Sequence, residues 1–347
     1  MKKLALLFVI VGTALFAVAQ DSHPLYEQTA KWTIGGDGFW DYLTLSPDGS
    51  RLFVAHSDKF EVIDTSNGKV VGEIPANGAH GTAIVADKKL GFSTNGRAGT
   101  VTVFDLDTLK VKTEIKAGEG PDAIIYDPHS RHVIVMNGHG KDMMAIDPST
   151  LKVDATVPLG GKLEFAAADA GHVYINVEDM GEIAAVNTKT WKADQRWKLT
   201  GCEEPGGLAI DEKLGRLFTA CGNKVMIVVD TRNGEQIATL PTGAGTDAAK
   251  FDPGLERAFA SNGEGTLTVI QQKPLKIKVK SKTEPMPDQY VVAGNVETMR
   301  GARTMALDPK SHKIYLATAE LGPPAEGQRR PSIKPGTFMI LVYSPAK

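Results

Sequence analysis

Seven residues that recur along the chain include the side chains best suited to bind a ligand or a metal. They are Asp41, His80, Asp122, Glu164, Gly206, Asp247 and Arg303, and from His80 to Gly206 they follow one another at intervals of 42 residues. Four carboxylates, an imidazole and a guanidinium brought around one point would attract a cation, or would raise the pKa values of the carboxyl groups by mutual repulsion.

The same residues are compatible with several kinds of metal site and with a purely structural role. Oxygen ligands from the four acids suit Ca²⁺ or Mg²⁺, and the imidazole among them would also suit Zn²⁺ or Mn²⁺. The fixed positive charge of Arg303 counts against a metal. A purely structural alternative is that these short side chains accept hydrogen bonds from loop backbone N–H groups and hold neighbouring elements in register.

The elements that must position these residues are repeated. One strand of each unit ends in an acid or amide, at intervals of 41, 42, 40, 43 and 41 residues: Asp64, Asp105, Asp147, Asn187, Asp230 and Gln271. A second marker, a tetrad such as "FSTN", "IVMN" or "FASN", occurs in seven copies. The apolar residues between the markers alternate or form short runs, broken by turn sequences such as "SPDGS" and "DPHS". This pattern predicts about four β-strands per unit.

Repeated four-stranded sheets of this size bury both faces only by stacking around an axis. The sequence therefore predicts an all-β fold, a seven-bladed β-propeller with four-stranded blades. It occupies residues 30 to 345 as one domain. The last copy offers three clear strands, and "KWTIGGDG" from Lys31 resembles the missing one. We expect residues 30 to 36 to complete the final blade and so close the ring.

Two stretches interrupt the period, near residues 272 to 298 and residues 320 to 336. The first contains Lys276, Lys278, Lys280 and Lys282. We expect these lysines on one face of a strand, as a solvated edge or as a patch for anionic surfaces. The second is rich in proline and glycine, which predicts a long surface loop without strands.

The tetrads and the strands that follow them, such as "VTVFDLDTLKV", resemble the YVTN repeat, and the chain as a whole resembles an exported YncE-like β-propeller. "CEEPGGLAID", "NGEGTLTVI" and "GARTMALDPKSHKIYLATAE" are similar to stretches of that family. The resemblance covers about residues 30 to 345. It implies the fold and export, and says little about activity, because members of the family mostly have no established chemistry.

The first 19 residues have the pattern of a secretory signal peptide: two lysines, an apolar run from Leu4 to Val18 and small residues at Ala17 and Ala19. We expect an exported protein, periplasmic or extracellular, with no membrane span once this segment is cleaved. A retained anchor is the alternative. Loss of Lys2 and Lys3 changes the formal charge from −2 to −4, which argues against nucleic acid as a partner. The only two cysteines, Cys202 and Cys221, are candidates for a disulfide or for two unpaired thiols.

We therefore expect a monomeric, non-catalytic propeller without a cofactor, which binds an unknown protein partner or small ligand at the mouth of its channel. Its polar contacts would be Asp41, His80, Asp122, Glu164, Asp247 and Arg303. The alternative is a metal-assisted lactonase or related hydrolase. In it a divalent ion would be held among Asp41, His80, Asp122, Glu164 and Asp247, with His80 as general base. Trp40 and Tyr42 flank Asp41 and would wall a pocket at this mouth or pack in the core.

Overall fold

The structure of the protein is a computed structural model that describes residues 25–273, 276–279, 282–285, 289–324, 327 and 331–346, the side chains of 276–279 and 282–285 excepted. The predicted signal peptide and Lys280 lie outside the described residues. Within this part of the chain, no helix has the length and apolar character that crossing a membrane would require.

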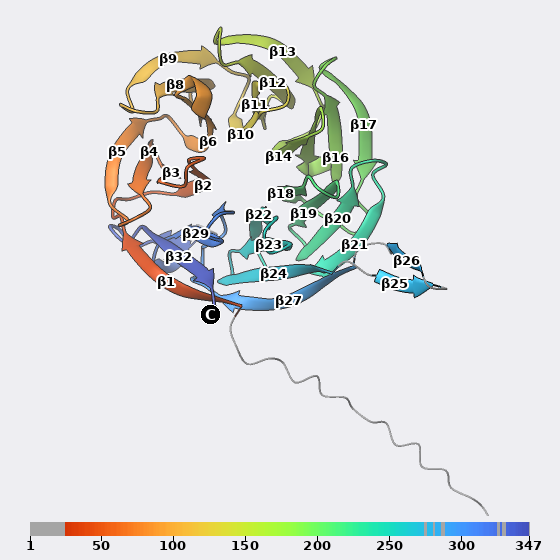
Figure 1. Ribbon diagram of the computed structural model, residues 1–347. Helices are drawn as coiled ribbons and strands as arrows, with labels where there is room; N and C mark the ends of the chain where they lie inside the picture. Colours follow the sequence, from red (N-terminus) through yellow and green to blue (C-terminus); the bar gives the residue numbers. More distant parts are fainter. Residues whose placement is uncertain are drawn as a thin grey trace, which may run out of the picture.

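The described strands form seven four-stranded antiparallel sheets around a central channel, a seven-bladed β-propeller (Figure 1). The fold class predicted from the repeat is confirmed. From the channel outward, the first three blades are β2 (Trp40–Leu45), β3 (Arg51–His56), β4 (Lys59–Asp64), β5 (Val70–Pro75); β6 (Ala79–Val85), β7 (Leu90–Asn95), β8 (Thr100–Asp105), β9 (Val111–Lys116); and β10 (Pro121–Asp127), β11 (His132–Asn137), β12 (Asp142–Asp147), β13 (Lys152–Pro158).

The next three blades follow the same order, except that the outermost strand of the sixth comes after an insertion. They are β14 (Leu163–Asp169), β15 (His172–Val177), β16 (Glu182–Asn187), β17 (Lys192–Lys198); β18 (Pro205–Asp211), β19 (Arg216–Cys221), β20 (Val225–Asp230), β21 (Gln236–Pro241); and β22 (Thr246–Asp252), β23 (Arg257–Asn262), β24 (Thr266–Lys273), β27 (Gln289–Glu297). Two short 3₁₀ turns, η1 (Ala86–Lys88) and η2 (Glu178–Met180), lie in hairpin connections.

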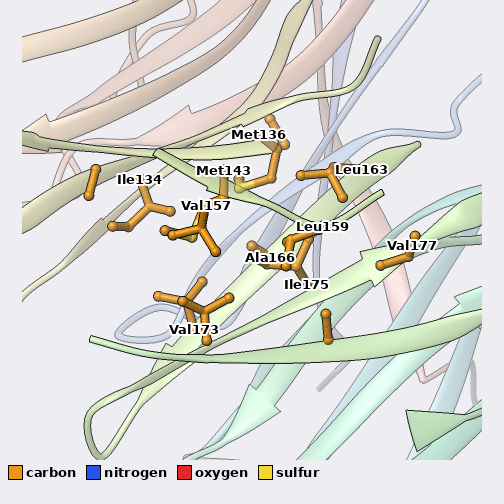
Figure 2. Packing of buried hydrophobic residues seen from close by; sticks show 14 of the residues in the cluster. Ile134, Met136, Met143, Val157, Leu159, Leu163, Ala166, Val173, Ile175 and Val177 are labelled. Atoms are coloured by element: carbon orange, nitrogen blue, oxygen red, sulfur yellow. The ribbon is translucent and has the colours of Figure 1, made fainter. Parts of the chain in front are cut away.

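The core of the molecule lies between adjacent blades. The second and third strands of most blades are apolar and buried along nearly their whole length, whereas the outermost strands bury only a few of their residues. Figure 2 shows one inter-blade cluster, in which Met136 and Met143 of the third blade pack against Leu163, Val173 and Ile175 of the fourth. Each sheet thus buries its apolar faces against its neighbours, as the repeat predicts.

The seventh blade joins the two ends of the described chain. It consists of β28 (Met305–Asp308), β29 (Lys313–Thr318), β32 (Met339–Pro345) and, outermost, β1 (Tyr26–Thr33). Closure by an N-terminal strand is confirmed, but the predicted bounds, residues 30 to 36, are wrong. The strand starts earlier because Tyr26 is buried against Phe259, and it ends at Thr33 because Gly35 and Gly36 turn the chain away with positive φ angles.

The lysine-rich insertion forms a separate antiparallel hairpin, β25 (Lys276–Val279) and β26 (Lys282–Pro285). The expectation that its lysines share one face of a single strand is wrong, because Lys282 belongs to the second strand and pairs with Val279. The edge of the sixth blade is β27, which pairs with β24 over eight residues. The insertion therefore adds a feature outside the blade and does not protect the blade edge.

The proline-rich segment is also more ordered than predicted. β30 (Leu321–Pro324) and β31 (Pro331–Ile333) form a short antiparallel pair, so the expectation of a loop without strands is wrong. Pro324 and Pro331 pair with each other at one end of this ladder, and prolines are tolerated there because both strands are edge strands. Leu321 and Ile333 pack against an apolar cluster that contains Trp40 and Phe338, and this contact fixes the hairpin above the channel mouth.

Candidate functional site

The innermost strand of each blade places the predicted residues at one mouth of the channel. In the first six blades the predicted residue is the second residue of the innermost strand, and in the seventh blade Arg303 stands two residues before β28. In six blades the register shifts at this position, which is the mark of a β-bulge. Bulges re-aim side chains and are frequent next to binding sites. We call the following residues the mouth ring: Asp41, His80, Asp122, Glu164, Asp247 and Arg303.

Hydrogen bonds between blades fix the backbone of the ring. The Oγ1 of Thr94 donates to the carbonyl oxygen of Asp122 at 2.6 Å, and the Nδ2 of Asn176 donates to that of Gly206 at 2.8 Å. The Ser261 hydroxyl donates in the same way to the Arg303 carbonyl. Our sequence analysis missed these positioning residues, although each is the polar third letter of a tetrad, "FSTN", "YINV" or "FASN".

Ion pairs divide the ring into three groups. His80 Nδ1 lies 2.6 Å from Asp41 Oδ2 and 3.4 Å from Asp122 Oδ1. Arg303 Nε lies 3.0 Å from Asp247 Oδ2. Lys162 Nζ lies 2.7 Å from Glu164 Oε1. Sequence analysis missed this lysine, which stands two residues before Glu164.

Asp122 is the one carboxylate of the ring without a strong partner. Its Oδ1 is buried and makes no hydrogen bond to any described residue. The nearest cationic group, the imidazole of His80, already donates from Nδ1 to Asp41. The four acids of the ring thus face three cationic groups, His80, Arg303 and the neighbouring Lys162, and the excess negative charge belongs to Asp122.

The ring carboxylates do not serve as turn caps. Among the described residues, no backbone N–H donates to a side-chain oxygen of Asp41, Asp122, Glu164 or Asp247. At the opposite ends of the same strands, equivalent acids do so: Asp127 accepts from the N–H of His129, and Asp252 accepts from that of Gly254. The proposal that the ring acids hold the blades in register through backbone N–H groups is therefore wrong.

Burial and mutual repulsion shift the proton affinities of the ring. Burial, helped by the charge of Asp41, raises the pKa of Asp122 to about 7. Burial and the charge of Asp122 raise the pKa of Glu164 to about 8, and burial raises that of Asp247 to about 6 although Arg303 opposes it. For His80, burial is outweighed by the hydrogen bond to Asp41 and the charge of Asp122, which raise its pKa to about 9. At neutral pH the ring therefore holds protons that an arriving cation would displace.

Three of the predicted metal ligands come close enough to share an ion. One oxygen each of Asp41 and Asp122 and a ring nitrogen of His80 lie within 4.8 Å of one another. The imidazole has room because residue 96 is glycine: a Cβ there would lie 2.6 Å from His80 Nε2. The other two predicted ligands, Glu164 and Asp247, are engaged by Lys162 and Arg303.

A pocket of about 310 Å³ adjoins the ring at Arg303. Its walls are mostly apolar and include the 56% exposed ring of Phe39, the indole of Trp40 and residues of the β30–β31 hairpin; the complete lining is Phe39, Trp40, Gly245, Gly263, Arg300, Gly301, Arg303, Leu321, Pro331 and Ile333. Trp40 is 8% exposed, and its Nε1–H has no hydrogen-bond partner among the described residues. Trp40 thus both packs in the core and lines this pocket, whereas Tyr42 points its hydroxyl at Glu164, 3.4 Å away.

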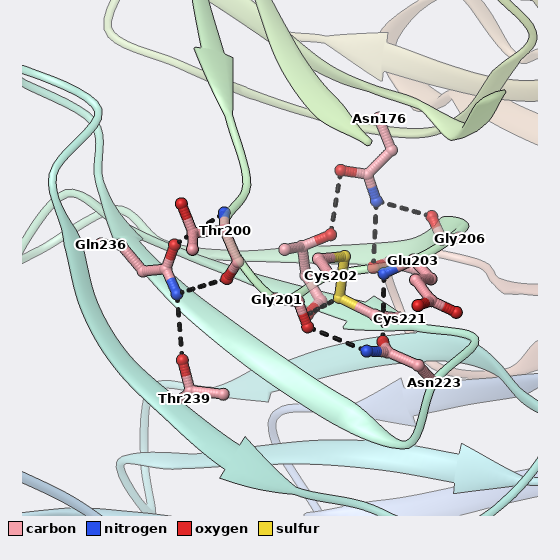
Figure 3. The surroundings of a disulfide bond; sticks show 12 residues. Asn176, Thr200, Gly201, Cys202, Glu203, Gly206, Cys221, Asn223, Gln236 and Thr239 are labelled. Atoms are coloured by element: carbon pink, nitrogen blue, oxygen red, sulfur yellow. Dashed lines mark hydrogen bonds between the residues drawn. A yellow bond between two sulfur atoms is a disulfide. The ribbon is translucent and has the colours of Figure 1, made fainter. Parts of the chain in front are cut away.

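A disulfide holds the chain that leads into the innermost strand of the fifth blade. Cys202, in the loop before β18, is bonded to Cys221, the last residue of β19 (Figure 3). The side chain of Asn223 adds hydrogen bonds to the carbonyl of Gly201 and the N–H of Glu203. On the chain-entropy account, a loop of this length stabilises the fold by about 3 kcal/mol. The bond therefore anchors the segment that ends at Gly206, the ring position without a side chain.

Comparison with known proteins reveals the fold and nothing finer. No protein-family model matches the chain, and no curated protein matches its sequence. Among solved structures, a chain of Kuenenia stuttgartiensis hydrazine synthase superposes with a TM-score of 0.63 at 15% identity, over 83% of this chain and 94% of that one. The structure of U3-55K superposes with a TM-score of 0.68 at 10% identity, over 88% and 97% of the two chains. At such low identities the likeness shows the fold alone.

Proposed function

We propose that the protein is an exported, non-catalytic propeller that binds a small ligand, or the matching group of a protein partner, at the mouth ring and the adjoining pocket. The observation that carries this proposal is that the ring acids are gathered at the channel mouth without backbone donors. Buried acids with raised pKa values destabilise a fold unless other groups pair with them. Residues that break a local rule without a structural gain are typical of functional sites.

The chemistry of the site favours a ligand with an apolar body and charged ends. Phe39, Trp40 and Leu321 offer apolar surface, and Arg300 and Arg303 offer guanidinium groups to a carboxylate. The Oδ1 of Asp122, which makes no hydrogen bond to a described residue, offers an acceptor to a cationic group. An apolar amino acid carries all three features, and the C-terminal end of a peptide carries the apolar body and the carboxylate.

The disulfide supports the exported location, because disulfides persist in oxidising compartments. The apolar segment Leu4 to Val18 supports it independently. The proposal includes the resemblance to YncE-like propellers, which the tetrads such as "FSTN" and "FASN" support.

Titration calorimetry with phenylalanine, leucine and short apolar peptides tests the ligand. We expect Arg303→Gln to weaken binding at least about tenfold, because it removes a charge-assisted hydrogen bond. Lys213→Gln removes one positive charge near the opposite mouth and should leave the affinity unchanged. Equal losses in both variants, or binding that survives Arg303→Gln and Asp122→Asn together, would place the ligand elsewhere.

A metal-assisted hydrolase is the second candidate, favoured by the convergence of Asp41, His80 and Asp122. A divalent ion there would activate a water molecule. The role of His80 as general base is opposed by its raised pKa of about 9, since a protonated imidazole accepts no proton at neutral pH.

Elemental analysis of the purified protein distinguishes the two candidates. Under the ligand proposal we expect no stoichiometric metal and no thermal shift on addition of Ca²⁺, Mn²⁺ or Zn²⁺. One equivalent of metal that disappears in Asp122→Ala, but remains in Asp247→Ala, would establish the metal site. The second variant is the matched control, because Asp247 is paired with Arg303.

A further inference from the structure

A lysine lies on the innermost strand of the sixth blade, farther from the mouth ring than Asp247. Lys250 is the fifth residue of β22, three residues beyond Asp247. The equivalent position of every other blade is uncharged: Thr44, Ala83, Ile125, Ala167, Ala209 and Ala306. The repeat therefore does not require a lysine here, and a charge buried against the local rule points to a function.

The amine of Lys250 has no polar partner within the described residues, where no hydrogen bond and no ion pair reaches it. Its Nζ lies 4.7 Å from the centroid of the Phe165 ring, so the aromatic face is its close contact. Phe165 in turn meets the ring of Tyr42 edge to face at 4.9 Å. Tyr42 and Phe165 each follow a mouth-ring residue directly in the sequence, so these contacts link Lys250 to the strands that carry the ring.

Lys250 lines two cavities, and the second reaches the ends of the inner strands that lie away from the mouth ring. The first, of about 360 Å³, has mainly apolar walls that include Leu43, Ile84, Ile124 and Ile125. The second, of about 430 Å³, contains the charged residues that share a cavity with the lysine: Asp211, Glu212 and Lys213. The carboxylate of Asp211 stabilises its own turn, because it accepts a hydrogen bond from the backbone N–H of Lys213.

The environment favours an uncharged ligand for this amine. Acids surround the opposite mouth, among them Asp127, Asp211 and Asp252, and their charge repels anions at long range. Burial alone lowers the pKa of Lys250 to about 8. An appreciable fraction of the amine is therefore neutral near physiological pH, and a neutral amine in an apolar pocket is a nucleophile.

We propose that the Lys250 amine captures small, uncharged, apolar aldehydes as an imine in this part of the channel. The nitrogen lone pair forms a bond to the carbonyl carbon, and a proton moves from nitrogen to the carbonyl oxygen to give a carbinolamine. The C–O bond then breaks, the second N–H proton moves to the departing oxygen, which leaves as water, and a C=N bond remains. Nothing is oxidised or reduced, and the step needs no second reactant.

Reductive trapping tests the proposal directly. The folded protein is incubated with benzaldehyde and cyanoborohydride at pH 7.5, and modified lysines are located by peptide mass spectrometry. We expect Lys250 to be labelled about tenfold faster than Lys213, since burial raises the fraction of its amine that is neutral and nucleophilic. Lys213 is the matched control, because it lines the same second cavity but has a 78% exposed side chain.

Variants and a charged probe separate this site from general lysine reactivity. Lys250→Met and Lys250→Arg should both fold, lose the fast label and leave the labelling of Lys213 unchanged. Glyoxylate, an anionic aldehyde, should show no preference for Lys250. Equal labelling of Lys250 and Lys213 by benzaldehyde, or an unlabelled Lys250 in the folded protein, would overturn the proposal.

Discussion

A chain that begins at Ile34 instead of Leu25 will lose of order 5 kcal/mol or more of its free energy of unfolding, which is comparable with the total stability of many domains. This truncation removes β1, the outermost strand of the seventh blade. Seven residues of β1 pair with β32, and each backbone hydrogen bond contributes about 0.5–1.5 kcal/mol. Tyr26 is 1% exposed, and burial of such a side chain contributes about 2–3 kcal/mol.

Urea unfolding followed by tryptophan fluorescence measures this loss, with the chain that begins at Leu25 as the control. Tyr26→Ala in that control should cost about 3 kcal/mol, because it leaves a cavity beside Phe259. If the chain that begins at Ile34 unfolds at the same urea concentration as the control, the outer strand does not hold the ring closed.

The repeat made the architecture predictable. The number of tetrads at near-constant intervals predicts the number of blades, and the turn sequences predict where each strand ends. The start of β1 was missed because the residues before Ala30, "YEQT", are polar except for Tyr26, and only the tertiary contact with Phe259 shows that this tyrosine is buried. The strands of the proline-rich segment were missed for a similar reason, since packing against Trp40 overrides their low β-propensity.

The mouth ring was predictable because it repeats, whereas its partners were not. The spacing of 42 residues identifies His80, Asp122 and Glu164, but no spacing reveals that Lys162 pairs with Glu164. Lys250 and the residues of the pocket beside Arg303 have no equivalents in the other blades. A search for residues that recur in every unit therefore does not find them. Such exceptions become visible only when coordinates show what surrounds each side chain.

The two mouths of the channel differ in how their acids are used. At the opposite mouth Asp127 and Asp252 accept hydrogen bonds from backbone N–H groups in turns and so stabilise the fold. At the mouth ring Asp122 and Glu164 are partly buried, and their pKa values are raised. The acids of the turns stabilise the propeller, whereas the acids of the mouth ring destabilise it at neutral pH. This difference is the physical reason for assigning a function to the mouth ring.

Asp122→Asn will make the protein more stable at pH 8, by about 1–3 kcal/mol. The folded-state pKa of Asp122 is raised from 3.8 to about 7. Between these values the folded state binds more protons than the unfolded state, so the stability that a protonated Asp122 provides is lost as pH rises from about 4 through 7. The variant lacks this loss, and its advantage should therefore shrink as the pH is lowered from 8 to 5.

Asp41→Asn is the matched control, since it removes one charge from the same ring but has the opposite expected sign. Asp41 lies 2.6 Å from His80 and supports the imidazolium. That contribution is complete below pH 6.5 and disappears as pH rises through about 9, so this variant should be destabilised at pH 7. Urea unfolding at pH 5, 7 and 8 measures both variants. If Asp122→Asn is no more stable than the parent at pH 8, the charge of Asp122 does not lower the free energy of unfolding. If it is more stable but loses the ligand, Asp122 is present for binding at the expense of the fold.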